Sequence, residues 1–445
     1  MNYYKLLNKI SDGSKNCIII NDDIYTYDHV NSDIIHLEQK IIESISISKK
    51  EIVAIFDKDI YFQFIAFFTL NKMEVIPLIL HPSTPYNEMS ELIKTNSIRY
   101  ILDSNNIKKV DNISLESSNI KNQKLDKCVN AVLSSGSTGL PKVFFRTYES
   151  WAGFFKNQNE VFNVNKDTVM FFHGPLSFTG NLNSILSVIY EGGTLVTYEG
   201  FNPAAWNKMI IKNNVNTMYL VPAKIKAFNR SLQKPITNIK SIFTGSQQLF
   251  GDLKTEMKKF YNNASVILYY GASELNYVTY ITLEELIKNP ISLGKPFKGV
   301  QIKEKDGFIY VNSNYFVIGL DKWATVKDTG YINKYGELIF NGRQSDIINK
   351  CGNTINLKRI WNKTMKIPYV TNAYVTSYED KLKEKEIALF IEVNRYITKF
   401  DFKKALSKEL LTYEMPKKIF ILDRIPLNDS GKVDRKFIVS KFNLC

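Results

Sequence analysis

The chain has 445 residues, of which 44% are hydrophobic and 23% are charged, and this composition excludes a largely disordered protein. Because one ordinary hydrophobic core does not organise a chain of this length, we expect at least two domains. The net charge of +14 comes from 58 Lys and Arg against 44 Asp and Glu, but the lysines are spread along the chain, so the charge by itself does not indicate a nucleic-acid partner.

Common patterns for metals, membranes and export are missing from the sequence. The four cysteines form no CxxC pair and the four histidines form no HExxH motif, so neither a zinc site nor a disulfide framework is indicated. No apolar run reaches the roughly 18–20 residues of a membrane-spanning helix. The first residues lack an apolar core behind a basic start, so we expect no signal peptide and a cytoplasmic location.

Apolar periodicity predicts a helix near the start of the chain. Ile34, Ile35, Leu37 and Ile41 recur at helical spacing within residues 26–45. This spacing places them on one face, which indicates an amphipathic helix.

A strand–helix–strand pattern follows. Residues 51–56 are typical of a buried strand, residues 62–71 of a helix, and residues 74–80 of a second buried strand. That order within so short a stretch indicates a parallel α/β unit. Short apolar strands at 217–222 and 266–270 are consistent with further units of this kind.

The pattern of predicted elements changes in the last third of the chain. Residues 306–320 and 330–343 contain short alternating strands joined by Gly, Asn and Asp turns, a pattern typical of hairpins. We predict a mixed α/β fold class, with a large N-terminal α/β domain of sheets and flanking helices over residues 1–343. A small, mobile α+β domain over residues 344–445 would follow it.

The stretch SSGSTGLPKV, which begins at Ser134, has the composition of a phosphate-binding loop. Gly136 and Gly139 allow backbone N–H groups to converge on an anion, and Lys142 adds a mobile positive charge. Two residues separate the last glycine from the lysine, so the spacing differs from that of a P-loop. Taken alone, such a stretch is most often only a turn.

Four further stretches carry groups suited to nucleotide chemistry. YYGASEL at 269–275 offers aromatic rings, a hydroxyl and a carboxylate, which could stack a base, contact a phosphate and hold Mg²⁺. DTGY at 328–331 puts a carboxylate beside a turn, which suits a ribose diol. NGRQSD at 341–346 puts an arginine at the expected domain boundary, and NDSGKVDR at 428–435 puts Lys432 behind a Ser-Gly turn. Each stretch taken singly is more often a turn or a solvated charge.

The order of these stretches resembles that of the adenylate-forming superfamily, which includes acyl-CoA synthetases, luciferases and the adenylation domains of peptide synthetases. The resemblance extends over about residues 20–440. SSGSTGLPK resembles the family's phosphate loop, TGSQQL its adenine pocket, and YYGASE its Y-G-x-T-E motif with Ser273 in place of threonine. KDTGYINKYGELIFNGR resembles its ribose and hinge region, and NDSGKVDR its C-terminal loop with the catalytic lysine.

The resemblance implies two half-reactions at one site. A carboxylate attacks the α-phosphorus of ATP, which gives an acyl-adenylate and pyrophosphate, and a thiol then attacks the activated carbonyl. Lys432 would bridge the carboxylate and the phosphate as charge reorganises. Glu274 would hold Mg²⁺, and Ser273 would hydrogen-bond the α-phosphate. Tyr270 would stack on adenine, and Asp328 would accept both ribose hydroxyls.

The same resemblance implies the rest of the nucleotide site and the thiol side. Arg343 would approach the ribose. The small domain would reorient between the two steps, and Gly352 would then shape the tunnel for the thiol. The other implied nucleotide ligands are Ser134, Ser135, Gly136, Ser137, Thr138, Gly139, Lys142, Gly245, Ser246 and Gly271.

The acid is indicated by one position in HGPLSFTGNLNS. Acyl-CoA synthetases often carry histidine where this chain has Phe178, and domains that activate α-amino acids usually place an aspartate there. Phe178 offers no charge for an ammonium group, and burying an unpaired ammonium is costly. We therefore expect a carboxylic acid without an α-amine, either fatty or otherwise apolar.

Three departures from the family's pattern leave the acceptor open. Ser345, Asn349 and Arg359 replace residues that the family usually carries in and after the hinge. We expect an acid–thiol ligase that uses ATP, Mg²⁺ and coenzyme A. Two alternatives stay open: a stand-alone ligase that transfers the acyl group to a carrier-protein phosphopantetheine, and a non-catalytic nucleotide-binding relative.

Overall fold

The computed structural model describes residues 1–110, 125–134, 141–247, 249, 253–320, 322–350, 353–380, 384–428 and 431–444. Within these ranges, the strands form five sheets of nine, six, four, three and two strands. The expected mixed α/β fold class is confirmed.

The six-stranded sheet has the strand order β6-β5-β3-β4-β7-β8. Strands β3 and β4 are parallel and α3 connects them, so the strand–helix–strand unit expected from the sequence is confirmed. Helix α3 is buried almost all round, with Asp59 accepting a hydrogen bond from the Phe62 N–H at its start. The elements are β3 (Ile52–Ile55), α3 (Ile60–Lys72), β4 (Ile76–Ile79), α4 (Tyr86–Thr95), β5 (Tyr100–Leu102), β6 (Ile107–Lys109), η2 (Leu125–Lys127), β7 (Cys128–Leu133) and β8 (Val143–Thr147).

The nine-stranded sheet has the order β15-β14-β13-β12-β11-β9-β10-β1-β2. Its elements are α1 (Tyr4–Leu7), β1 (Asn16–Ile20), β2 (Asp23–Thr26), α2 (Tyr27–Ser44), α5 (Ala152–Phe162), β9 (Val169–Phe172), α6 (Thr179–Glu191), β10 (Thr194–Thr197), α7 (Pro203–Lys212), β11 (Thr217–Tyr219), α8 (Pro222–Asn229), β12 (Ser241–Thr244), α9 (Leu253–Phe260), β13 (Ser265–Ala272), β14 (Asn276–Thr282), α10 (Leu283–Lys288) and β15 (Lys295–Pro296). Strands β10, β9, β11, β12 and β13 pair in parallel. Their carboxyl ends therefore meet at one edge, where ligands bind in open α/β sheets.

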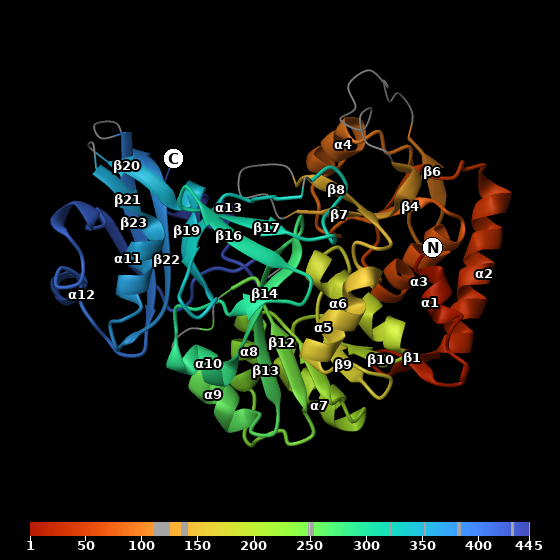
Figure 1. Cartoon of the computed structure of the whole chain (residues 1–445), viewed down its shortest axis with the longest axis horizontal. Helices are drawn as coiled ribbons and strands as arrows, with labels where there is room; N and C mark the ends of the chain where they lie inside the picture. The colour runs from red at the N-terminus through yellow and green to blue at the C-terminus, as the bar shows by residue number, and fades with distance from the viewer. Residues whose placement is uncertain are drawn as a thin grey trace.

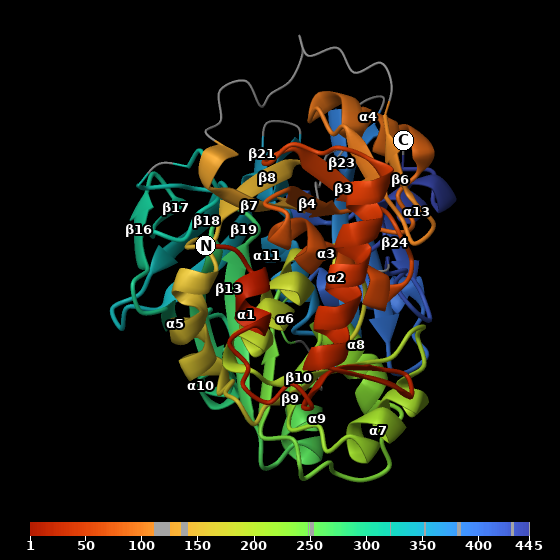
Figure 2. The same cartoon turned by 90° about the vertical axis from the view of Figure 1, so that its right-hand side faces the viewer.

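The helix expected over residues 26–45 is α2, which begins at Tyr27. The Thr26 side chain accepts a hydrogen bond from the His29 N–H and so caps the helix N-terminus. Helices α2 and α3 lie side by side (Figure 2). None of the described helices is both long and apolar enough to span a bilayer.

The remaining strands follow in two groups. The four-stranded antiparallel sheet comprises β16 (Gln301–Lys305), β17 (Phe308–Asn312), β18 (Asp328–Ile332) and β19 (Leu338–Arg343). After it come η3 (Gln344–Asp346), β20 (Ile347–Lys350), β21 (Asn353–Asn356), α11 (Leu357–Thr364), β22 (Val370–Asp380), β23 (Glu384–Val393), α12 (Lys399–Leu406), η4 (Thr412–Glu414), β24 (Lys418–Ile421) and α13 (Arg435–Lys441).

The elements after β19 have apolar cores of their own. One buried cluster runs from Ile348 to Ile419, and a second runs from Tyr378 to Leu444. In Figure 1, β20 to β23, α11 and α12 form a group on the left, beside the elements that precede them. The domain boundary between residues 343 and 344 stays a prediction.

Candidate active site

A cavity of about 1720 Å³ lies where the carboxyl edge of the nine-stranded sheet meets the four-stranded sheet and the C-terminal elements. It brings together residues from every motif singled out in the sequence. The predicted site residues that line it are Ser134, Lys142, Ser246, Tyr270, Gly271, Ser273, Glu274, Asp328, Arg343 and Lys432.

A buried carboxylate forms one corner of the cavity. The Tyr270 hydroxyl donates to Asp328 Oδ2 at 2.6 Å, and Arg343 Nε lies 3.4 Å from Asp328 Oδ1. Burial raises the pKa of the Asp328 carboxyl, while the Tyr270 hydrogen bond and the Arg343 charge pull it down. Burial also raises the pKa of the Tyr270 phenol, so the phenol stays protonated and can donate.

Besides its ion pair with Arg343, Asp328 can accept one more hydrogen bond. Its Oδ1 accepts no hydrogen bond from the described part of the chain, although it is buried. A buried carboxylate oxygen without a donor is costly, and a ligand hydroxyl would supply that donor. Such a corner suits a sugar diol.

The turn that carries Ser273 and Glu274 rests on a buried arginine that sequence reasoning missed. Arg146, on β8, is fully buried and donates from Nη2 to the Ser273 carbonyl oxygen at 2.6 Å. Its Nη1 donates to the Tyr315 carbonyl oxygen at 3.3 Å, and its guanidinium lies 4.9 Å from the centroid of the Trp151 ring. Burial lowers the pKa of Arg146 to about 10, and the Glu274 charge acts in the opposite direction.

Arg146 is therefore still charged at neutral pH and fixes the turn beside Glu274. In the sequence it is one basic residue in a short strand, and nothing local marks it as buried. The only signal was its closeness to the glycine-rich loop.

The base of that glycine-rich loop is closed by two hydrogen bonds. The Ser134 N–H donates to the Lys142 carbonyl oxygen at 2.9 Å, and the Lys142 N–H donates to Ser134 Oγ at 3.3 Å. The intervening predicted ligands lie outside the described residues; they are Ser135, Gly136, Ser137, Thr138 and Gly139.

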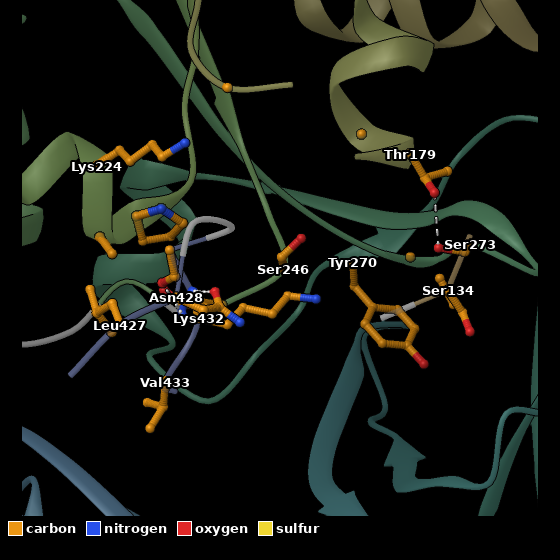
Figure 3. A pocket seen from close by; sticks show the side chains of 18 of the residues that line it. Ser134, Thr179, Lys224, Ser246, Tyr270, Ser273, Leu427, Asn428, Lys432 and Val433 are labelled. Atoms are coloured by element: carbon orange, nitrogen blue, oxygen red, sulfur yellow. Dashed lines mark hydrogen bonds between the residues drawn. The ribbon is translucent and has the colours of Figure 1, made fainter. Parts of the chain in front are cut away.

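A hydroxyl chain connects this loop to the Ser273 turn. Ser273 Oγ donates to Thr179 Oγ1 at 3.3 Å, a contact drawn in Figure 3. Thr179 Oγ1 in turn donates to the Leu133 carbonyl oxygen at 3.1 Å, one residue before the loop begins. The start of α6, the end of β7 and the turn after β13 are thus held together.

Lys432 reaches the cavity from a tight loop between β24 and α13. The loop is closed by a hydrogen bond of 2.7 Å from the Asn428 N–H to the Lys432 carbonyl oxygen. Gly431 has φ +75°, and a Cβ there would lie 2.8 Å from Val221 Cγ2, so this position requires glycine. Gln247 Nε2 donates to the Gly431 carbonyl oxygen at 3.0 Å and so connects the loop to the segment that follows β12.

The Lys432 side chain extends from this loop toward Tyr270 (Figure 3). Burial lowers the pKa of its amine, and the charges of Arg343 and Arg435 lower it further. These neighbours make the centre of the cavity positive, as an anionic ligand would require. Two further contacts join the C-terminal elements to the elements before them: Lys436 Nζ lies 2.6 Å from Glu88 Oε1, and Lys226 Nζ donates to the Thr371 carbonyl oxygen at 3.4 Å.

Phe178 and Gly245 are not among the residues that line the cavity. The Phe178 ring packs on His81, with 5.3 Å between ring centroids, at the start of α6. Gly245 is buried, and a Cβ there would lie 2.4 Å from the Tyr269 ring. Gly245 therefore allows Tyr269 to pack against the end of β12.

His173 and Lys224 also line the cavity, and sequence reasoning missed both. Lys224 Nζ donates to the His173 carbonyl oxygen at 3.1 Å. Burial and the Lys224 charge lower the pKa of His173 to about 4. The imidazole is therefore neutral at physiological pH. Of these two residues, Lys224 alone carries a charge, and that charge is positive.

A comparison with known protein families shows to which family the chain belongs. The model for the AMP-binding enzyme family matches residues 12–307, which is more than half of the chain.

The chain belongs to the AMP-binding enzyme family.

Curated relatives in this family are distant. The uncharacterized acyl-CoA ligase YhfT of Bacillus subtilis (strain 168) is 28% identical over 319 residues, which cover 68% of this chain and 66% of YhfT. VraA of Staphylococcus haemolyticus (strain JCSC1435), provisionally named a long chain fatty acid-CoA ligase, is 26% identical over 391 residues, covering 84% and 83%.

Solved structures share the fold over nearly the whole chain. The o-succinylbenzoate CoA synthetase MenE of Bacillus subtilis, in complex with the acyl-adenylate intermediate OSB-AMP, matches with a TM-score of 0.81 and 18% identity. The match covers 98% of this chain and 97% of MenE. At this identity the likeness shows the fold alone.

One of the three departures, Arg359, and the neighbouring Lys350 form ion pairs inside the C-terminal elements. Arg359 Nε lies 2.7 Å from Oε1 of the buried Glu414, and Arg359 Nη2 donates to the other carboxylate oxygen at 3.3 Å. Lys350 Nζ lies 3.0 Å from Oε2 of the buried Glu386. Arg359 and Lys350 thus have structural partners, and Gly352 lies outside the described residues.

Proposed function

We propose that this AMP-binding enzyme activates a carboxylic acid with ATP and transfers the acyl group to the thiol of coenzyme A. The acid's carboxylate forms a bond to the α-phosphorus, and the bond to pyrophosphate breaks. The thiol sulfur then attacks the acyl carbon, and AMP leaves. The observation that supports this best is that Lys432, from the C-terminal domain, lines the same cavity as Asp328 and Glu274 of the large domain.

Each half of the cavity has a role in the proposed adenylation. Asp328, with Tyr270 on one oxygen, would accept a ribose hydroxyl on the other. Lys432 would neutralise the oxygens at the reacting phosphorus, where preorganised positive charge lowers the barrier most. Lys142, at the base of the glycine-rich loop, would hold the leaving pyrophosphate.

A magnesium ion fits this arrangement. The described residues contain no group of three or more His, Cys, Asp or Glu side chains that could hold a metal. Mg²⁺ is usually held by one or two carboxylates together with substrate phosphates, and Glu274 on the cavity wall offers one carboxylate. When bound, the ion would neutralise phosphate charge, and Arg146 would fix the turn that presents Glu274. MenE structures hold ATP with magnesium in one case and a product analogue, OSB-NCoA, in another.

The acid would lack an α-amine and have an apolar body. Phe178 supplies no carboxylate near the start of α6, and the positive Lys224 close to Gly174 would repel an ammonium group. The domains would divide between residues 343 and 344, and the small one would reorient between the two half-reactions.

ATP–pyrophosphate exchange with a panel of fatty and aryl acids tests the first half-reaction. We expect exchange with some of these acids and none with α-amino acids, which serve as the matched control. Absence of exchange with every fatty and aryl acid would overturn the proposal.

The acceptor is tested separately by adding coenzyme A to preformed acyl-adenylate. Fast release of AMP is expected. Release only with a phosphopantetheinylated carrier protein would favour the alternative acceptor, which the substitution at Asn349 keeps open.

A further inference from the structure

One part of the cavity, called the compartment below, is lined by helix α6 and strand β13. Thr179, Gly180 and Asn183 of α6 line it on one side, and Tyr269 of β13 lines it on the other. Thr179 contacts Ser273, so this face of α6 starts at the proposed α-phosphate ligand. If the proposed function holds, an acid that reaches that phosphate would extend its other atoms along Gly180 and Asn183.

Two buried tyrosines pack against this part of α6, and one of them, Tyr269, also lines the cavity. The hydroxyls of Tyr219 and Tyr269 are 3.0 Å apart, and the two residues are 4% and 8% exposed. A Cβ on Gly180 would lie 2.1 Å from the Tyr219 hydroxyl oxygen. The helix backbone therefore contacts the phenol directly, and no chain can pass between α6 and β11.

The two phenol rings are fixed in place by their neighbours. The Tyr219 ring stacks on Phe243 with 5.1 Å between centroids, and the Tyr269 ring meets Tyr277 edge-on at 4.5 Å. Gly245 lies against the Tyr269 ring. Because interiors packed this closely do not yield space without loss of stability, the end of the compartment is rigid.

A buried amide beside the phenols lacks a partner. Asn183 is 3% exposed, and its Oδ1 accepts a hydrogen bond from Gln158 Nε2 at 3.1 Å. Its Nδ2 has no hydrogen-bond partner in the described part of the chain. A buried donor left unpaired costs about 1–3 kcal/mol, and an acceptor oxygen on a ligand would remove that cost.

The end of the compartment is neutral. Burial raises the pKa of Tyr219 to about 12 and raises the pKa of Tyr269 well above its usual value. Both phenols are thus protonated at physiological pH, so their hydroxyls do not repel an acceptor oxygen by negative charge.

We propose that the acid is compact, ends at the Tyr219–Tyr269 pair, and carries a neutral hydrogen-bond acceptor at its far end that pairs with Asn183 Nδ2. A keto, hydroxyl or amide oxygen has this chemistry. This inference rests on the proposed function and narrows it, because long fatty chains would be excluded.

ATP–pyrophosphate exchange with pentanoate, dodecanoate and 4-oxopentanoate tests the inference on the unmodified protein. We expect kcat/KM for pentanoate to exceed that for dodecanoate by at least about tenfold. We expect 4-oxopentanoate to exceed pentanoate by about tenfold, because it pairs the buried donor.

Variants assign the two effects to residues. Tyr219→Ala is expected to raise exchange with dodecanoate relative to pentanoate, whereas Tyr219→Phe, which keeps the ring, should keep the length limit. Asn183→Leu should bring the ratio between 4-oxopentanoate and pentanoate close to one. Asn213→Leu, the same change at the end of α7, should leave that ratio as it is.

The outcomes separate this inference from the proposed function. Dodecanoate used as well as pentanoate would overturn the compact acid while leaving adenylation intact. Equal use of pentanoate and 4-oxopentanoate would overturn the claim that the acid carries an acceptor at its far end. Water would then be the hydrogen-bond partner of Asn183. Exchange with none of the three acids, nor with any of the wider panel, would overturn the proposed function itself.

Discussion

The two halves of the cavity are held in place by different means. Among the elements that precede residue 344, the fully buried Arg146 donates one hydrogen bond to the Ser273 carbonyl oxygen and another to the Tyr315 carbonyl oxygen. The C-terminal half is held to these elements by contacts such as the pair between Lys436 and Glu88, whose side chains are 82% and 25% exposed. Buried charged networks are rigid because breaking them leaves unpaired groups, whereas exposed ion pairs contribute little. The difference is what the proposed reorientation would require, with the Lys432 loop leaving the cavity while the corner at Asp328 stays fixed.

The largest expected effect is that of Lys432→Ala. We expect adenylation to fall by about 10²–10³-fold, because the reacting phosphorus loses its positive partner. Thioesterification of supplied acyl-adenylate should be spared, since the lysine would have left the site by then. Pyrophosphate exchange and AMP release measure the two steps. Equal losses in both would contradict the domain movement, and no loss in either would show that Lys432 takes no part in the reaction.

Arg146→Met should have the next largest effect, through the position of Ser273 and Glu274. We expect kcat for adenylation to fall by about 100-fold, more than KM changes, because small misplacements of catalytic groups are costly. Arg146→Lys should restore only part of it, since an ammonium lacks the planar fork. Arg99→Met removes an exposed ion pair with Glu51 and serves as the control. An Arg146 variant that unfolds early yet adenylates normally would assign the residue to stability alone.

Asp328→Asn tests the nucleotide corner with a smaller effect. Asparagine still accepts from the Tyr270 hydroxyl but loses the charge that attracts a ribose hydroxyl. The wild-type protein should prefer ATP over 2′-deoxy-ATP by about tenfold in kcat/KM, because the deoxy nucleotide loses one buried hydrogen bond. This preference should shrink in the variant. Asp306→Asn, at an exposed hairpin turn, is the matched control. A preference that survives in Asp328→Asn would place the ribose elsewhere.

The smallest effect is expected from Lys436→Met, which removes the exposed contact with Glu88. Adenylation should slow by less than about threefold, and the effect should vanish at high salt, because exposed ion pairs are weak and screened. Lys441→Met, on the same helix, controls for the loss of charge. A loss as large as that of Arg146→Met would show that both halves are equally rigid, and the contrast between them would fail.

Local patterns in the sequence were sufficient for the elements and the order of the motifs. The apolar runs at β3, α3 and β4 predict that unit correctly, because a parallel strand and a helix that are buried on all sides carry few polar residues. Helix α2 was placed within one residue of its start. Glycine-rich and carboxylate-bearing turns mark where backbone approaches a ligand, and several of the residues predicted from them line the cavity.

Only the tertiary structure decided which side chains meet. Arg146 and Ser273 are 127 residues apart in the sequence, Tyr270 and Asp328 are 58 apart, and the Tyr219–Tyr269 pair is separated by 50. Phe178, expected at the acid site, packs on His81. These contacts depend on the strand order β13-β12-β11-β9 and on the four-stranded sheet that folds over its edge. Strand order is set by the free energy of packing the whole sheet, and no local run of residues records it.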